Sequence, residues 1–202
     1  MKLYFSPGAC SLSPHIVARE AGLPITLVRV DTKGKKTITG VDYLSINGKG
    51  YVPLLELDDG TRLTEGPAIV QYLADRAPQK KLAPANGTIE RYKLQEWLNF
   101  ITSELHKQFS PLFDPSMPED AKAKFRDKIA ARFDWIVAQL GDKPYLTGED
   151  FTVADAYLFT VANWTKYTGI DLAHWPVLQA YMARVAARHD VQAALREEGL
   201  LK

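Results

Sequence analysis

Hydrophobic residues recur at two different spacings along this chain of 202 residues, and the change comes near residue 80. Before that point, short apolar runs alternate with segments of helical periodicity, which is the pattern of strands and helices in turn. After it, apolar residues return every three or four positions, which is typical of amphipathic helices. The pattern predicts an α/β first part followed by an all-α second part.

The first part is expected to contain four strands and two main helices. The predicted strands cover 2–5, 25–30, 52–57 and 62–64, with a turn at 58–60, and the predicted helices cover 11–21, 42–46 (short) and 66–77. Ser11 or Ser13 can cap the first helix and Gly22 can end it, while Pro67 suits the first turn of the last one. This order of elements predicts a thioredoxin-like domain.

A segment without periodicity separates the two parts. Residues 78–88 include Pro78, Pro84, Asn86 and Gly87, which favour turns and loops. Beyond them the expected helices cover 89–109, 119–140, 153–167, 177–187 and 191–198. We therefore predict a thioredoxin-like domain at 1–80, a linker at 81–88 and an all-helical domain at 89–202.

The dipeptide Val52-Pro53 begins one of the predicted strands. A cis peptide bond there would leave the Val52 backbone amide at an open site. A trans proline would merely begin an edge strand. The sequence leaves both possibilities open.

Composition and charge exclude several classes of protein. Hydrophobic residues make up 46% and charged residues 24%, which excludes disorder. The 25 basic and 24 acidic residues give a net charge of +1, without the basic excess of a nucleic-acid binder. No apolar run is long enough to span a bilayer, and the run at 3–5 is too short for a signal peptide. With a single cysteine and hence no internal disulfide, we expect a cytoplasmic protein with no nucleic-acid or membrane partner.

The single cysteine, Cys10, follows the first predicted strand at the start of the first predicted helix. The helix dipole and the N–H groups of the first turn stabilise a thiolate at such a position. A dithiol motif would have its second cysteine at position 13, where Ser13 stands. An internal disulfide cycle is therefore excluded, but a mixed disulfide with a small thiol is not. The alternative is a small, inert core residue.

The helix predicted at 89–109 has one apolar and one polar side. The apolar side, expected to face the core, carries Leu94, Trp97, Leu98, Ile101 and Leu105, and the polar side carries Tyr92, Gln95, Asn99, Ser103 and His106. Asn99 and His106 lie two turns apart. A helix packed beside the first domain could direct them toward Cys10; otherwise the polar side is simply solvated.

Two groups in the first part could bind charged ends of a ligand. Glu65 and Gly66 come just before a helix, where a carboxylate and backbone N–H groups could hold the ammonium and carboxylate of an amino acid. The lysine-rich loop at 33–36 could bind a second carboxylate, although such loops are usually only solvated.

In the helical part, the candidate functional residues are aromatic. Phe113, Trp164 and Tyr167 could line an apolar pocket, or they could belong to the core. Thr152 and Asp155 form a capping box that opens an apolar helix, and this motif is expected to be structural.

Taken together, these motifs resemble the cytosolic glutathione S-transferases. The shared motifs are Val52-Pro53, Thr64-Glu65-Gly66-Pro67-Ala68-Ile69 and Phe151-Thr152-Val153-Ala154-Asp155. Three further segments resemble the bacterial beta class of this family: Ser6-Pro7-Gly8-Ala9-Cys10-Ser11, Trp97-Leu98-Asn99-Phe100 and Ser103-Glu104-Leu105-His106-Lys107. The resemblance runs from Met1 to Lys202.

The resemblance implies a homodimeric enzyme that stabilises the thiolate of glutathione and transfers it to small hydrophobic electrophiles. Glutathione would be a co-substrate, with no metal and no permanently bound cofactor. Cys10 and His106 are the implied catalytic residues, and Glu104 is implied to reach the γ-glutamyl group bound by the partner subunit. The implied glutathione-binding residues are Lys35, Val52, Glu65, Gly66, Asn99, Ser103 and Glu104, and the implied electrophile pocket includes Phe113, Trp164 and Tyr167.

Two departures from the wider family bear on mechanism. Gly66 replaces a serine found in many classes, so only its backbone can donate a hydrogen bond. Phe5 stands where an aromatic residue with a hydroxyl is common, and Tyr4 points to the opposite face of a strand. The resemblance therefore favours a mechanism that depends on Cys10 over one in which a tyrosine activates glutathione.

Two other functions remain open at this point. One is a glutathione-dependent thiol–disulfide oxidoreductase or reductive dehalogenase with Cys10 as the nucleophile. The other is a non-enzymatic, glutathione-transferase-like binding protein. The presence of Cys10, Glu65, Asn99 and His106 together argues against the non-enzymatic alternative, since an interaction module need not keep a full ligand constellation.

Overall fold

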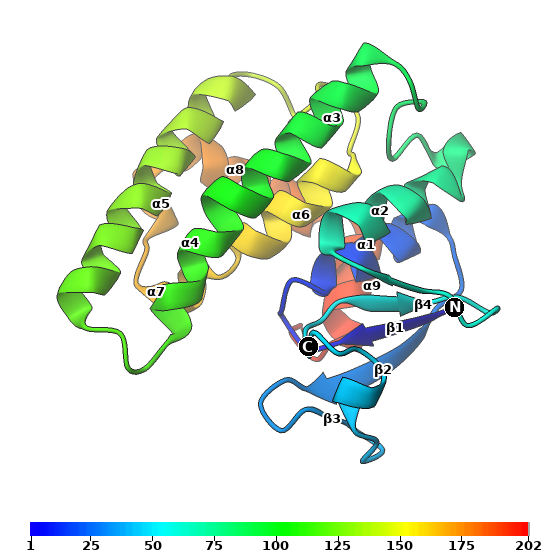
Figure 1. Ribbon diagram of the computed structural model, residues 1–202. Helices are drawn as coiled ribbons and strands as arrows, with labels where there is room; N and C mark the ends of the chain where they lie inside the picture. Colours follow the sequence, from blue (N-terminus) through cyan, green and yellow to red (C-terminus); the bar gives the residue numbers. More distant parts are fainter. Residues whose placement is uncertain (202) are drawn as a thin grey trace. The chain divides into compact units, whose positions relative to one another are not determined.

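The computed structural model describes residues 1–201 of the chain, and it contains two units (Figure 1). Unit 1 comprises residues 1–83 together with the chain from Ala187 onward, and unit 2 comprises Pro84–Ala186. Each unit has its own secondary structure and core, and we describe them in turn.

A five-stranded sheet in the order β3-β2-β1-β4-β5 forms the centre of unit 1 (Figure 1). The strands are β1 (Lys2–Phe5), β2 (Thr26–Asp31), β3 (Lys36–Thr37), β4 (Leu54–Glu56) and β5 (Arg62–Thr64). The central pair β1 and β2 is parallel, and the other neighbouring pairs are antiparallel. This confirms the predicted thioredoxin-like arrangement and adds β3, a two-residue edge strand that the sequence did not indicate.

Three helices of unit 1 pack together, since α1 contacts both α2 and α9. They are α1 (Leu12–Ala21), α2 (Gly66–Asp75) and α9 (His189–Glu197), with short 3-10 helices η1 (Tyr43–Ser45) and η2 (Pro78–Lys80). Every residue of α1 except Arg19 is buried. Gly22, with φ of 67°, ends α1 as predicted. Ser11 occupies the N-cap position but makes no capping hydrogen bond with its side chain.

An apolar cluster in unit 1 packs around the start of β4. Its buried members are Tyr4, Val30, Tyr43, Val52 and Leu54. The rings of Tyr4 and Tyr43 lie 5.7 Å apart between centroids. The Val52–Pro53 peptide bond within this cluster is cis, so the structure decides between the two possibilities that the sequence left open.

Unit 2 is helical throughout its regular elements. They are α3 (Ile89–Phe100), a π-helical segment (Ile101–His106), α4 (Lys107–Phe109), η4 (Ser110–Phe113), α5 (Glu119–Leu140), α6 (Val153–Ala162), α7 (Thr165–Thr168), η5 (Leu172–His174) and α8 (Pro176–Ala186). α5 has the predicted bounds. The helix predicted at 89–109 is continuous but becomes π-helical at 101, and the helix predicted at 153–167 is divided into α6 and α7.

The capping box at the start of α6 is present, with Thr152 and Asp155 bonded reciprocally. The fully buried Asp155 carboxylate also accepts hydrogen bonds from the Leu146 N–H at 2.9 Å and the Tyr181 hydroxyl at 2.9 Å. Burial raises the pKa of Asp155, and the hydrogen bonds it accepts act in the opposite direction. All residues of α6 are buried. The hydrogen bonds to Asp155 therefore hold the start of a fully buried helix in place.

The division of the chain corrects our predicted domain bounds, which placed all of residues 89–202 in one helical domain. The chain from Ala187 onward, which includes α9, belongs to unit 1, and charged residues of this segment pair with α1. Arg188 forms a bidentate ion pair with Glu20, with distances of 2.6 and 2.8 Å. His15 pairs with Glu197 and Glu198. These partners are far apart in the sequence, and helical periodicity carries no information about them.

Among the described residues, no helix is both long enough and apolar enough to cross a membrane.

Candidate functional site

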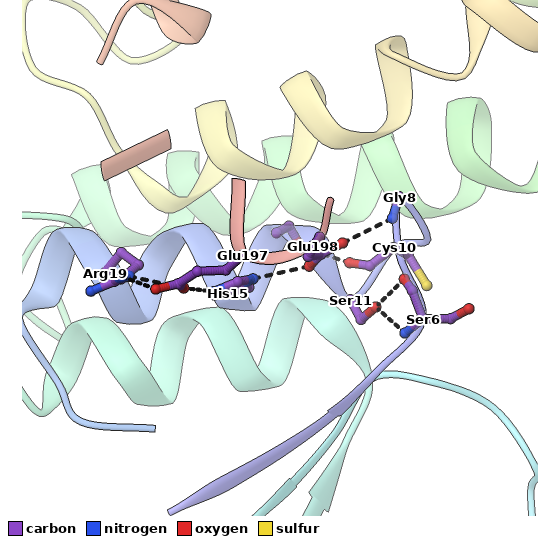
Figure 2. Close-up of polar contacts among 9 residues, drawn as sticks. Ser6, Gly8, Cys10, Ser11, His15, Arg19, Glu197 and Glu198 are labelled. Atoms are coloured by element: carbon purple, nitrogen blue, oxygen red, sulfur yellow. Dashed lines mark hydrogen bonds and ion pairs between the residues drawn. The ribbon is translucent and has the colours of Figure 1, made fainter. Parts of the chain in front are cut away.

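The loop that carries Cys10 joins β1 to α1 and is held by its own side chains (Figure 2). The Ser11 hydroxyl accepts a hydrogen bond from the Ser6 N–H at 3.1 Å and donates one to the Ser6 carbonyl at 3.2 Å. Ser13 donates to the Cys10 carbonyl at 3.1 Å. Cys10 is partly exposed, and its thiol donates to the Val52 carbonyl at 3.2 Å. Cys10 is therefore not a fully buried core residue.

Residues near the C-terminal end of the described chain also contact the Cys10 loop. The Gly8 N–H donates to one carboxylate oxygen of Glu198 at 2.8 Å, and the other oxygen lies 3.0 Å from Nδ1 of His15. Nε2 of His15 lies 2.8 Å from Glu197, and Figure 2 shows this chain of contacts along α1. The imidazole of His15 is fully buried, with a carboxylate at each ring nitrogen. Sequence reasoning missed this anchor because its partners lie 183 residues apart.

Segment 49–52 connects four of the predicted residues of unit 1. The Val52 carbonyl accepts the Cys10 thiol, and the Gly50 carbonyl accepts the ammonium of Lys35 at 2.9 Å. The ammonium of Lys49 donates to the Glu65 carboxylate at 2.7 Å. The structure thus brings Cys10, Lys35, Val52 and Glu65 together around one short segment.

Two side chains hold the segment in place through hydrogen bonds to the backbone of its third residue, Tyr51. The Tyr51 carbonyl accepts hydrogen bonds from the Tyr43 hydroxyl at 2.7 Å and from the Asn47 side-chain amide at 2.8 Å. Tyr43 is fully buried and Asn47 is nearly so. Because these two donors come from the core, the backbone of segment 49–52 keeps a defined geometry.

Glu65 has an uncommon backbone conformation for a residue other than glycine, with φ of 68°. Its carbonyl accepts the N–H groups of Ala68 and Ile69 at the start of α2. This places a carboxylate that is 67% exposed directly before the helix N-terminus. At Gly66 an added Cβ would meet no atom within 4 Å, so the space beside this backbone is open.

In unit 2, the polar side of α3 continues into the π-helical segment. Asn99 and Ser103 are exposed, and the Ser103 hydroxyl donates to the Asn99 carbonyl at 3.0 Å. Glu104 pairs with Arg132 of α5 at 2.6 and 3.1 Å. π-helical turns occur frequently at functional sites, and this one contains three of the predicted residues.

His106, the last residue of the π-helical segment, lies among aromatic side chains. Its Nδ1 atom is 2.7 Å from the hydroxyl of Tyr157, and its ring centroid is 4.8 Å from that of Trp164. Trp164 also contacts Phe113, at 5.9 Å between centroids. Two of the three predicted pocket residues are therefore in contact with each other, while Tyr167 is 71% exposed. The contact of His106 with Tyr157 was not predictable from the sequence, because Tyr157 lies in an apolar helix.

The predicted residues are thus divided between the two units. Cys10, Lys35, Val52, Glu65 and Gly66 lie in unit 1, and the others lie in unit 2. Within the described part of the chain, no cluster of three or more His, Cys, Asp or Glu side chains could hold a metal ion.

Comparison with known proteins decides the family. Residues 8–76 match the model of the glutathione S-transferase N-terminal domain, and residues 119–184 match that of the C-terminal domain. The glutathione S-transferase GstA of Escherichia coli O157:H7 is 48% identical over 200 residues, which cover 99% of this chain and 100% of that protein. The chain belongs to the glutathione S-transferase family.

Solved structures of other glutathione S-transferases agree with this assignment. A bacterial beta-class glutathione S-transferase of Sphingomonas chungbukensis is 46% identical, with a TM-score of 0.96 and complete coverage of both chains. A sphingomonad glutathione S-transferase in complex with glutathione is also 46% identical, with a TM-score of 0.96, and the match covers 99% of this chain and 100% of that one. The resemblance to the bacterial beta class is confirmed.

The hydroxyl of Tyr4 is engaged within the sheet of this glutathione S-transferase. It lies 3.4 Å from Glu56, and the ring is 5% exposed. Burial, and secondly the charge of Glu56, raise the pKa of Tyr4. These contacts agree with the expectation that the mechanism does not depend on a tyrosine of β1.

Proposed function

We propose that this chain binds glutathione on unit 1 and transfers its sulfur to small hydrophobic electrophiles. The observation that carries the proposal is the convergence of Cys10, Lys35 and Glu65 on segment 49–52. This arrangement offers a cation, an anion and a thiol around one short backbone segment. Glutathione carries the complementary groups: two carboxylates, an ammonium and a thiol on a peptide backbone.

Each part of glutathione has a proposed partner in unit 1. The Glu65 carboxylate takes the γ-glutamyl ammonium, and the backbone N–H of Gly66 at the start of α2 takes the adjoining carboxylate. The backbone of Val52 pairs with the cysteinyl part, and Lys35 takes the glycyl carboxylate. The contact between the Cys10 thiol and the Val52 carbonyl supports this order, because it places a thiol where the cysteinyl sulfur is expected.

The proposed chemistry is stabilisation of a thiolate followed by nucleophilic attack. The glutathione thiol loses its proton to water. The thiolate sulfur then forms a bond to an electrophilic carbon, which releases an electron pair to its leaving group or conjugated acceptor. Hydrogen bonds donated to the sulfur favour the thiolate, and each unit by which they lower its pKa corresponds to about 1.4 kcal/mol. In this proposal Cys10 donates one of these hydrogen bonds.

Unit 2 is proposed to supply the remaining groups. The family resemblance assigns Asn99, Ser103 and His106 to glutathione, and Glu104 to the γ-glutamyl group held by the partner subunit of a homodimer. Phe113, Trp164 and Tyr167 are the proposed electrophile pocket. The contact between Phe113 and Trp164 supports an aromatic wall there.

The family relationship favours the transferase over the two other functions that the sequence left open. The single cysteine suits a reducing compartment, so we propose a cytoplasmic enzyme. The aromatic character of the proposed pocket suits apolar electrophiles, which is compatible with detoxification as the physiological task.

Calorimetric titration with glutathione tests the assignment of Glu65. Replacing Glu65 by Gln keeps the shape but removes the charge that would pair with the γ-glutamyl ammonium. We expect the dissociation constant to rise about tenfold or more, because a charge-assisted hydrogen bond contributes about 1.5–3 kcal/mol.

Glu56→Gln is the matched control for Glu65→Gln. Glu56 pairs with Lys2 at 2.9 Å, much as Glu65 pairs with Lys49 at 2.7 Å, and it lies in the same unit outside the proposed site. Its replacement is expected to leave glutathione affinity unchanged. An unchanged affinity in Glu65→Gln would contradict the proposed assignment.

A further inference from the structure

The His106 ring is hydrogen-bonded to a phenol from the interior of unit 2. Tyr157 belongs to α6 and is 2% exposed, and its hydroxyl oxygen lies 2.7 Å from Nδ1 of His106. This distance is that of a strong hydrogen bond. The contact alone does not say which atom carries the hydrogen, and that depends on the neighbouring groups.

One direction of this hydrogen bond fits the groups around it best. The Thr102 hydroxyl lies 2.8 Å from the Leu98 carbonyl, which can only accept, so the Thr102 hydrogen is directed there. The Tyr157 hydroxyl lies 3.3 Å from Thr102 but 2.7 Å from His106. An unprotonated imidazole nitrogen is a stronger acceptor than a hydroxyl oxygen, so we take the Tyr157 hydrogen to be directed to the closer atom, Nδ1 of His106. A neutral His106 that accepts at Nδ1 carries its proton on Nε2.

The surroundings hold both rings in fixed positions. The Trp164 ring meets the His106 ring nearly edge-on, at an interplanar angle of 68°. α6 is anchored at its start by Asp155, which is bonded to the fully buried Tyr181. Tyr157 therefore projects from a helix that is fixed at its first turn, and His106 ends a π-helical segment whose geometry differs from that of the flanking helix.

We infer that Tyr157 is a positioning residue that holds His106 in the Nε2–H tautomer, so that His106 presents a hydrogen-bond donor rather than a proton acceptor. The inference rests on the proposed function, because it takes His106 to act on the glutathione sulfur. In that role the Nε2–H group would donate to the developing thiolate. The tyrosine acts through histidine and does not itself contact the ligand.

Steady-state kinetics of Tyr157→Phe test this inference, because the substitution removes the hydroxyl and keeps the ring. We expect kcat to fall about three- to tenfold, the effect of one hydrogen bond, with KM for glutathione within about twofold of wild type. Tyr181→Phe is the matched control, since it removes a phenol hydrogen bond of similar burial, the one to Asp155 at the start of α6. It should lower stability and leave kcat unchanged.

The variant His106→Asn separates this inference from the proposed function. If Tyr157 acts through His106, Tyr157→Phe should have no further effect on kcat in the His106→Asn background. A wild-type kcat for Tyr157→Phe, combined with a reduced kcat for His106→Asn, overturns the inference alone. An unchanged kcat for His106→Asn would overturn the proposed role of His106 and this inference with it.

Nitrogen-15 NMR of the imidazole rings gives a readout that does not depend on activity, and its wild-type spectrum does not depend on the folding of any tyrosine variant. The His106 signals are assigned by their loss in His106→Asn. We expect wild-type His106 to show a protonated Nε2 and an unprotonated Nδ1 at neutral pH, and Tyr157→Phe to show a changed tautomer ratio. A wild-type ring protonated at Nδ1 alone would overturn the inference.

Discussion

Cys10 illustrates how a single residue acquires its role from its surroundings. The thiol is the only one in the chain, it is partly exposed, and its position just before α1 places it near the positive end of a helix dipole. Its present acceptor is the Val52 carbonyl. A thiol in this setting can donate a hydrogen bond to a bound thiolate, and it can also exchange with a disulfide.

The two capacities of Cys10 predict different outcomes for Cys10→Ala. We expect conjugation activity to stay within about tenfold of wild type, which is the effect of losing roughly 1.4 kcal/mol. Exchange with oxidised glutathione should be lost completely. In the wild type, the Cys10 thiolate would attack one sulfur of oxidised glutathione and form a mixed disulfide, releasing glutathione as the thiolate.

Intact-mass spectrometry after incubation with oxidised glutathione measures this exchange. The wild type should gain one glutathionyl group, and Cys10→Ala should gain none because the chain has no other thiol. Cys10→Ser provides a control that keeps a hydrogen-bond donor. A wild type without an adduct would discard the covalent capacity and leave the hydrogen bond as the role of Cys10.

At the residue scale, local motifs identified the candidate site residues but not the residues that form hydrogen bonds or ion pairs with them. Cys10, Val52 and Glu65 were predictable because each stands at a fixed place relative to a strand end or helix start. Lys49 pairs with Glu65, and Tyr157 pairs with His106, across 16 and 51 positions of sequence. Such contacts depend on tertiary structure, and an ordinary lysine or a tyrosine in an apolar helix gives no local sign of them.

At the scale of elements, three strands of unit 1 are linked by one carboxylate. Glu56 of β4 accepts hydrogen bonds from Lys2 of β1 at 2.9 Å and from Arg62 of β5 at 3.0 Å. The Glu56 side chain is 12% exposed. The hydrogen bond from Lys2 is the main cause that lowers the pKa of Glu56 below its usual value, and the Arg62 contact adds to it.

The lowered pKa of Glu56 sets the sign of a pH effect on stability. Since the folded-state pKa lies below the unfolded value, the contribution is present above the unfolded pKa and is lost as the pH falls through the folded pKa. We expect Glu56→Gln to lower the free energy of unfolding by about 1 kcal/mol at pH 7, with the difference from wild type shrinking below about pH 4.

Chemical unfolding between about pH 3 and pH 7 measures this difference. Glu96→Gln is the control, because Glu96 forms an exposed ion pair with Lys93 within one helix, where little stability is at stake. The comparison must be between variants, since burial raises the pKa of Asp155 and gives the wild type an opposing slope. A Glu56→Gln protein whose difference from wild type stays constant with pH would contradict the prediction.

Strong periodicity made most elements predictable, and its absence explains the exceptions. α5 has the predicted bounds because 22 residues of amphipathic pattern leave little ambiguity. β3 has two residues, which is too short for any alternation to be visible. The π-helical segment at 101–106 was not predictable, because a local change in hydrogen bonding leaves the apolar spacing of the long helix almost unchanged.

At the scale of the whole molecule, the proposed assembly is a homodimer with two composite sites. Glu104 of each subunit is proposed to serve the glutathione of the other, and its ion pair with Arg132 within the same chain holds the carboxylate in place. We expect light scattering at assay concentration to give twice the mass of the chain. Glu104→Gln should remain dimeric and bind glutathione more weakly, and a fully active monomer would rule out the shared site.

The return of α9 to unit 1 has a consequence for how the chain folds during translation. β1 and α1 leave the ribosome early, while Glu197 and Glu198, the acidic partners of the buried His15, are not yet synthesised. All of unit 2 is encoded between these two parts of unit 1, so it can pack first. Unit 1 can be completed only when α9 emerges, and until then the nascent chain carries a histidine without its carboxylate partners and a Cys10 loop without its anchor.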